Sequence, residues 1–309
     1  NLFIFAFLVF LLFQIYEFEK FISYISFTIT LVCLIFSILG ILEFFNINLL
    51  NFQTNTRPGS TLSIRNFASE YAIIALPFSL IFCSKKNNKT IKIFSALSAL
   101  IILVFIFFCR TRSSYVVLFI YFIILTIFFL YRKITFGQNL IKNYAIIILI
   151  IIISFIIGIY SAPNIDKERK NLNNTVASIF DINYPENTAR INYWKTAAKI
   201  FLDEPVTGIG TGSWFGIYPN YNGNIYTDEN VLKTSELNPH NDYLEVLSEN
   251  GIFGFTFYII LLFTVGIRLL TETRSRFLAL PVFLSYSGFL FVSFFSFPKD
   301  NVSLMILFS

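Results

Sequence analysis

His240 is the only histidine in the chain, and it is therefore the side chain best suited to accept a proton near neutral pH. It stands in the stretch Pro239-His240-Asn241-Asp242, directly before the expected start of a helix. Backbone N–H groups at a helix N-terminus favour an anion, so an anionic substrate would be held close to the imidazole. The alternative is a loop histidine that is exposed to solvent and has no catalytic role.

Several arginines lie where a charge needs a substrate or a partner. Arg112 stands between two apolar segments with almost no loop to keep it in water, and charges at membrane depth usually face a cavity or a partner. Arg110 has the same neighbours, and the alternative for both is a side chain that reaches back to the aqueous interface.

Arg190 is expected to open an amphipathic helix, where a basic residue opposes the helix dipole and favours an external anion. Its alternative is an ordinary solvated charge. Arg65 precedes another apolar segment, and Glu70 is expected to pair with it.

The acidic and glycine-rich segments give weaker signals. Thr207–Ser213 (TGIGTGS) lacks the Lys-Ser/Thr pair of a phosphate-binding loop and follows Pro205, so it predicts a tight turn. Asp242 and Glu245, spaced as in a capping box, would suit a cation site together with Glu249, but a capped and solvated helix start explains them more simply. The cysteines have no CxxC spacing and lie in or beside apolar segments, which predicts small buried side chains and no metal site: Cys33, Cys83 and Cys109.

Together these residues predict an external cavity with several guanidinium groups, one imidazole, no metal cluster and no cofactor. Guanidinium groups bind phosphate oxygens in a bidentate manner. The combination therefore suits a polyanionic substrate carried by a lipid.

The elements that must position these residues are membrane helices. Hydrophobic residues make up 56% of the chain and charged residues 13%, with a mean hydropathy of +0.70, which excludes a soluble fold. The formal net charge of +5 does not indicate nucleic-acid binding, because Lys and Arg are scattered between apolar segments.

About eight segments approach the length that spans a bilayer, and they are continuously apolar, which predicts an α-helical bundle and not a barrel. The segments are Asn1–Tyr16, Phe21–Phe45, Phe67–Cys83, Ile91–Cys109, Ser113–Tyr131, Tyr144–Ala162, Gly251–Leu270 and Phe277–Phe297. A ninth helix is expected to begin at Val302–Ser309, and the apolar ends predict that the sequence is a fragment.

The short loops predict the orientation, because Lys and Arg prefer the cytoplasmic side. Alternate loops carry eleven basic residues on one side and five on the other, which places the second set outside. The eleven are Lys20, Lys85, Lys86, Lys89, Lys92, Arg132, Lys133, Lys142, Arg268, Arg274 and Arg276, and the five are Arg57, Arg65, Arg110, Arg112 and Lys299.

The same alternation places the long polar segment 163–250 on the external side. Within it, Asn187 or Thr188 is expected to cap a helix that ends before Pro205. Asp242 is expected to open a further helix that runs toward the membrane.

Three stretches share a pattern with one family. Pro239–Glu245 with Glu249–Phe255 contains the pattern HN..L…E.G..G, which is the most specific of the three. Arg190–Trp214 contains R…W…A…I…P…G.G…, and Thr111–Tyr115 is similar to an SRG element that starts a membrane span. With these patterns the chain resembles the O-antigen ligase and polymerase superfamily of bacterial envelope glycan enzymes.

The resemblance covers roughly residues 57–297. Within this range, the stretch from Arg65-Asn66 to Pro77 resembles an N…A…LP segment that lies upstream of the other motifs in the family. It departs from the pattern in two ways. Thr111 and Ser113 stand on either side of Arg112, where the family usually has Ser and Gly. The family normally has more membrane spans, which is consistent with missing terminal helices.

The resemblance implies an all-α, polytopic transmembrane bundle akin to the GT-C glycosyltransferases. It implies transfer of a glycan from undecaprenyl diphosphate to an acceptor on a glycan, lipid A-core or protein, without metal or cofactor. The setting would be the bacterial inner membrane, with the long loop in the periplasm. The implied catalytic residues are His240, Arg112 and Arg190, and the implied substrate-binding residues are Arg65, Arg110 and Asn241.

The expected domains are a first membrane part (1–162), an extracytoplasmic loop domain (163–250) and a second membrane part (251–309). The leading prediction is a ligase, and a polysaccharide polymerase of the same superfamily is the alternative. A transporter or flippase for a lipid-linked glycan is a rival from another class, but the sequence shows no repeated halves. A receptor-like binding loop would leave Arg112 unexplained.

Overall fold

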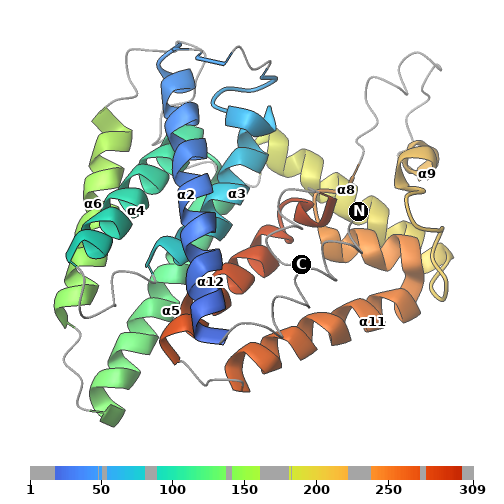
Figure 1. The fold of residues 1–309 in the computed structure, drawn as a ribbon. Coiled ribbons are helices and arrows are strands. Elements are labelled where there is room, and N and C mark those ends of the chain that lie inside the picture. The colour runs from blue at the N-terminus through green and yellow to red at the C-terminus, as the bar shows by residue number, and fades with distance from the viewer. Residues whose placement is uncertain are drawn as a thin grey trace.

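The computed structural model describes residues 18–47, 49–50, 54–80, 89–136, 141–160, 181, 183–221, 238–271 and 276–300. Within these ranges the chain is all-α, as predicted, and an isolated bridge between Thr56 and Ile64 is the sole β-type pairing there. Figure 1 shows the arrangement of the helices. The α-helices are α2 (Phe18–Phe44), α3 (Arg65–Leu80), α4 (Lys89–Cys109), α5 (Arg112–Phe136), α6 (Ile141–Tyr160), α8 (Pro185–Asp203), α9 (Trp214–Tyr221), α11 (Asp242–Thr271) and α12 (Arg276–Val292), and the 3-10 turns are η1 (Ser60–Leu62) and η3 (Pro298–Asp300).

Helices α2, α4, α5 and α11 are each long and apolar enough to cross a membrane. Helices α6 and α12 contain shorter apolar segments, Ala145–Tyr160 and Leu280–Val292. The polytopic helical bundle predicted from the sequence is therefore confirmed. The helices expected over residues 1–16 and 302–309 lie outside the described residues.

Helix α3 forms the centre of the bundle, in contact with α2, α4, α5 and α12. Every residue from Ala68 to Ser79 is buried. The small side chains of Ala68, Ala72 and Ala75 recur at helical spacing, and small residues let neighbouring helices approach closely. This packing fixes the first turns of α3, which carry several of the candidate site residues.

Pro77 interrupts the hydrogen bonding of α3, and neighbouring helices compensate for it. Proline has no N–H, so the carbonyl of Ile73, four residues earlier, loses its helical donor. The Tyr121 hydroxyl of α5 donates to that carbonyl at 3.2 Å, and Ser285 of α12 donates to the carbonyl of Ile74 at 2.8 Å. Backbone polar groups inside a membrane need such partners, so these two bonds hold α5 and α12 against α3.

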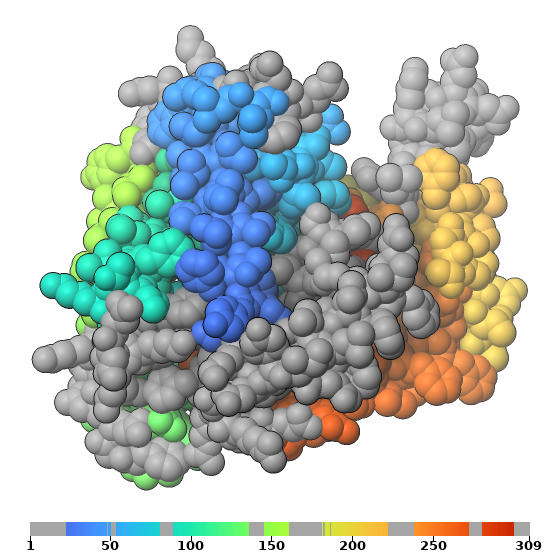
Figure 2. All heavy atoms as spheres, viewed as in Figure 1, coloured from blue at the N-terminus to red at the C-terminus, as the bar shows by residue number. Residues whose placement is uncertain are grey.

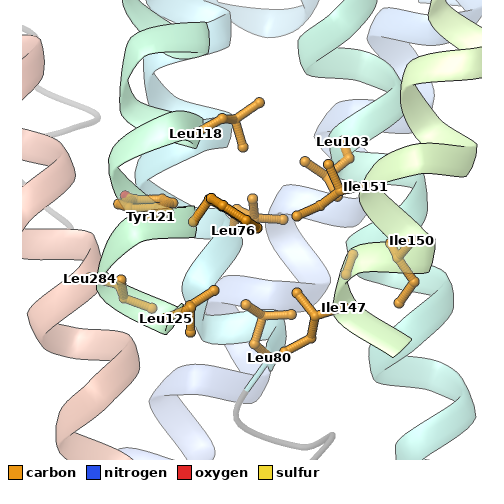
Figure 3. Close-up of a pocket in the computed structure, with 12 residues that line it drawn as sticks. Leu76, Leu80, Leu103, Leu118, Tyr121, Leu125, Ile147, Ile150, Ile151 and Leu284 are labelled. Atoms are coloured by element: carbon orange, nitrogen blue, oxygen red, sulfur yellow. The ribbon is translucent and has the colours of Figure 1, made fainter. Parts of the chain in front are cut away.

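A cavity of about 30 Å³ lies inside the bundle, between α3, α4, α5, α6 and α12 (Figure 3). Its walls are apolar apart from Tyr121, and they include Leu76, Leu103, Leu118 and Ile151. A cavity of this size is large enough for a water molecule, but its walls offer almost no polar partners for one. None of the candidate site residues lines it, so this cavity is a packing gap and not the functional site.

The N-cap of α8 lies three residues before Asn187, the first of the two predicted caps. Tyr184 is its N-cap residue and Pro185 its first helical residue, whereas Asn187 and Thr188 lie in the first turn. Proline is favoured at the first helical position because its fixed φ suits the helix and its missing N–H has no partner there. The helix ends at Asp203, before Pro205, as predicted. In Figure 1, α8 slopes away from α3 toward α11.

Candidate active site

One face of α8 gathers the three residues predicted to be catalytic. Asn187, Arg190 and Tyr193 are spaced three residues apart, so they lie along one side of the helix. Arg112 donates from Nη1 to Asn187 Oδ1 at 2.8 Å, and the His240 ring lies 6.1 Å from the Tyr193 ring. Asn187 and Tyr193 are separated by about 9 Å of helix. The structure therefore places Arg112, Arg190 and His240 around one short stretch of α8.

Arg112 is the first residue of α5 and points toward α8. Its guanidinium carbon lies 5.3 Å from the centre of the Tyr184 ring, a cation–π contact that adds to its bond with Asn187. Asn187 is itself held by donating from Nδ2 to the carbonyl of Asp181 at 2.7 Å. Arg112 is half-buried, so it engages a protein partner and does not simply extend into water.

Glu70, in the second turn of α3, has partners other than the one expected. It accepts a side-chain hydrogen bond from Ser296 and interacts electrostatically with Arg190. The expected pairing with Arg65 is therefore wrong. The packing of α3 against α12 brings Glu70 close to Ser296 in the segment after α12, although the two are far apart in the sequence. Glu70 thereby links Arg190 to the centre of the bundle.

His240 has a strained backbone and aromatic neighbours. Its φ is 54°, in the left-handed region that side chains other than glycine rarely adopt. Its ring is half-buried and lies 5.3 Å from that of Phe297, which in turn packs on Phe67 of α3 at 5.3 Å. Tyr193 faces the ring from α8. His240 therefore lies between α8 and the segment after α12 and is not a freely solvated loop residue.

Arg65 and Arg110 meet at the same end of the bundle. Both are within electrostatic range of the Tyr115 hydroxyl, which donates to the carbonyl of Phe107 at 3.2 Å. Arg65 Nε is buried and has no hydrogen-bond partner among the described residues. Arg110 is buried and also has a positive φ, 51°. A buried N–H without a partner is rare, and a bound ligand is one explanation for it.

The start of α11 differs from the predicted capping box. Asn241 is the cap, because its Oδ1 accepts the N–H of Leu244 at 3.1 Å. Asp242 accepts the backbone N–H of Lys299 at 3.3 Å, and Glu245 pairs with Lys299 Nζ at 2.8 Å. Both carboxylates are buried and not solvated. The Asn241 carbonyl oxygen, predicted to bind substrate, is thus already used in the helix cap.

The glycine-rich turn binds a carboxylate of the protein itself. Gly208, Gly210 and Gly212 have φ of 67°, 98° and 77°, which confirms the predicted tight turn. The N–H groups of Gly212 and Trp214 each donate to Glu249 at 2.9 Å. Glu249 therefore serves as the anion of a backbone N–H nest and is not available as a cation ligand.

In the described part of the chain, no group of three or more His, Cys, Asp or Glu side chains lies close enough to hold a metal ion. Cys33 and Cys109 are free and buried, as predicted, whereas Cys83 lies outside the described residues.

Sequence reasoning missed the segment after α12, which carries Ser296, Phe297 and Lys299. These residues contact Glu70, His240 and Glu245, respectively. Lys299 was assigned only to an external short loop. The one available signal was a lysine at the end of an apolar segment. The sequence does not identify which carboxylates that lysine meets.

A family model described as O-antigen ligase matches residues 97–259, which is 163 of the 309 residues. The matched segment runs from α4 into α11 and includes Arg112, Arg190 and His240. A comparison with curated proteins found no match. Because the match covers more than half of a polytopic helical chain and includes the whole α8 face, the chain belongs to the O-antigen ligase family.

Proposed function

We propose that this protein transfers a glycan from undecaprenyl diphosphate to the hydroxyl of an acceptor sugar, in the manner of an O-antigen ligase. The reaction would take place at the end of the bundle where α3, α5, α8 and α11 meet. The protein would lie in the bacterial inner membrane with segment 163–250 in the periplasm, between membrane parts 1–162 and 251–309.

In the proposed reaction, the acceptor oxygen attacks the anomeric carbon while the bond from that carbon to the diphosphate oxygen breaks. The electron pair of that bond leaves with the lipid diphosphate, and the hydroxyl proton passes to His240. A single displacement inverts the configuration at the anomeric carbon. Arg112 and Arg190 stabilise the charge that develops on the leaving group, which accounts for catalysis without a metal.

One observation carries this proposal: the guanidinium groups and the imidazole lie along a single face of α8. Arg112 engages Asn187, Arg190 follows one turn later, and His240 faces Tyr193 after one more turn. A diphosphate needs several donors fixed before the reaction, and a rigid helix face supplies that spacing.

Arg65, Arg110 and Asn241 are proposed to bind the substrate around this centre. The buried, unpartnered Nε of Arg65 supports an anion contact. Asn241 would contribute through its Nδ2 group, because its oxygen caps α11.

The same chemistry would serve a polymerase, because ligase and polymerase share the donor and the leaving group. Deleting the gene distinguishes the two. Surface glycans that lose attachment to their acceptor indicate a ligase, and glycans that are attached but short indicate a polymerase.

The reaction is tested with membranes that contain the protein, a lipid-linked donor and an acceptor glycan. His240→Ala is expected to abolish transfer while donor binding persists, because the imidazole acts on the acceptor and the arginines hold the donor. Arg112→Lys is expected to reduce transfer strongly, since an ammonium group cannot form the two-pronged contact of a guanidinium. Product formation is followed by gel mobility and mass spectrometry.

Two exposed residues provide matched controls, Asn192→Ala on α8 and Arg268→Lys at the end of α11. Both should transfer at the native rate. Undiminished transfer by His240→Ala would rule out its role as the proton acceptor, and full activity of Arg112→Lys would show that the paired N–H contact is not needed.

A further inference from the structure

The C-terminal end of α8 and the turn after it present apolar side chains that the bundle does not cover. Leu202 is 72% exposed and Val206 is 52% exposed. The inner side of α8 is different, since Ala197 and Ile200 are buried against Trp214 and its neighbours. The outward apolar side chains therefore do not contribute to the core of the loop.

This exposed turn is joined to the membrane helix α11. The N–H of Ile252 donates to the carbonyl of Pro205 at 2.8 Å, and Gly251 packs directly against the carbonyl of Val206. Ile252 and Phe253, on α11 just after this junction, are 45% and 62% exposed. Leu202 and Val206 on one side of this junction and Ile252 and Phe253 on the other are here called the α8–α11 edge. Figure 2 shows the yellow end of α8 lying against the orange α11 at one side of the molecule.

Helix α11 is exposed where it meets this edge. None of the residues in its most apolar stretch is buried within the protein, and Phe257, one turn beyond Phe253, is 72% exposed. In a helix that crosses a membrane, such a surface is covered by acyl chains. The α8–α11 edge continues that surface, so the end of α8 lies at the same boundary.

The charges on α8 fit a helix that lies at a membrane surface. Lys195 and Lys199 are exposed and precede Leu202 by seven and three residues, so the three share one side of the helix. Lysines of interfacial helices extend their ammonium groups to lipid phosphates while their stems cover apolar surface. Two acidic residues, Asp203 and Glu204, oppose this contact, but both act on Tyr221 of α9, whose hydroxyl donates a hydrogen bond to Asp203.

We infer that the α8–α11 edge rests in the boundary between lipid headgroups and acyl chains, and that it anchors the loop to its own membrane. Leu202 and Val206 enter the bilayer beside Ile252 and Phe253, and Lys195 and Lys199 contact lipid phosphates. The inference does not depend on the proposed reaction, because its test contains no transfer step.

The test places a nitroxide spin label at Leu202→Cys or at Val206→Cys in the otherwise complete protein. Cys83 is replaced by alanine, and Cys33 and Cys109 stay because they are buried. The protein is reconstituted in nanodiscs of phosphatidylethanolamine and phosphatidylglycerol. Collision of each label with oxygen, which concentrates in lipid, is compared with collision with a water-soluble nickel chelate. Both sites are exposed, so the substitutions should leave folding intact, and size-exclusion elution checks this.

Two further labels calibrate the depth: Asn192→Cys is exposed on α8, and Phe257→Cys is exposed on α11. The ratio of oxygen to nickel collision at Leu202 and Val206 should be several-fold higher than at Asn192 and no higher than at Phe257. Ratios at Leu202 and Val206 equal to that at Asn192 would overturn the inference.

Discussion

At the scale of single residues, Lys299 makes it possible to bury the carboxylates of Asp242 and Glu245, which follow His240 in the sequence. Its ammonium group lies 2.8 Å from Glu245 Oε1, and its backbone N–H binds Asp242. A buried carboxylate is strongly destabilising without a counter-charge and hydrogen bonds. The side chain of Lys299 is 22% exposed and that of Glu245 is 7% exposed, so solvent screens this pair only in part.

Lys299→Met is expected to lower the free energy of unfolding by about 3 kcal/mol, since it leaves Glu245 charged and buried without its partner. Thermal unfolding in detergent, followed by intrinsic fluorescence, measures the change. Adding Glu245→Gln to Lys299→Met should recover part of the loss, because the unpaired charge is then removed. Lys195→Met, at an exposed position, is the control and should change stability by less than about 0.5 kcal/mol. Equal effects of Lys299→Met and Lys195→Met would mean that the pair does not stabilise the fold.

At the scale of elements, the bend of α11 at Gly251 joins the apolar part of this helix to the turn that follows α8. Gly251 has φ 61° and ψ −168°, a conformation that is essentially restricted to glycine. A Cβ there would collide with the carbonyl of Val206, and one on Gly208 would collide with the backbone of Glu249. The turn after α8 thus docks on the bend without any intervening side chain, and Glu249 completes the contact by binding the N–H of Trp214.

Gly251→Ala is expected to destabilise this junction by about 1–3 kcal/mol, because it adds both strain and a collision. Amide hydrogen exchange should become faster between residues 206 and 214, and the midpoint of thermal unfolding should fall. Gly216→Ala is a matched control, because a Cβ at that position in α9 meets nothing within 4 Å. That variant should be neutral or slightly more stable, as alanine favours helix over glycine. Unchanged exchange in Gly251→Ala would show that the bend does not hold the turn.

At the scale of the whole molecule, the structure gathers the predicted external residues at one end of the bundle. The first turns of α3 and α5 meet α8 there through Glu70 with Arg190 and through Arg112 with Asn187. The predicted alternation of loops requires all of these groups to lie on one aqueous side of the membrane.

The orientation can be tested by labelling single cysteines in intact cells with a maleimide that does not cross the membrane. Asn192→Cys on α8 should react at once, because the loop is predicted to face outward. Lys133→Cys, exposed in the last turn of α5, should react only after the membrane is permeabilised. The Cys83→Ala background corrects for native thiols. The opposite labelling pattern would reverse the predicted topology.

The amino-acid sequence by itself determined the membrane helices and the types of chemical group at the site. A continuously apolar segment must satisfy its own backbone in lipid, so α2, α4, α5 and α11 follow from local composition. Proline and glycine likewise fixed local features, such as the end of α8 before Pro205 and the tight turn at Gly208–Gly212.

Only the tertiary structure decided which side chains pair. Glu70 interacts with Arg190 and not with nearby Arg65, and Glu245 binds Lys299 and does not form a capping box. These partners are 54 to 120 residues apart in the chain, so their distance depends on how helices pack and not on local sequence. The same packing places His240 against α8, which no spacing of residues along the chain could establish.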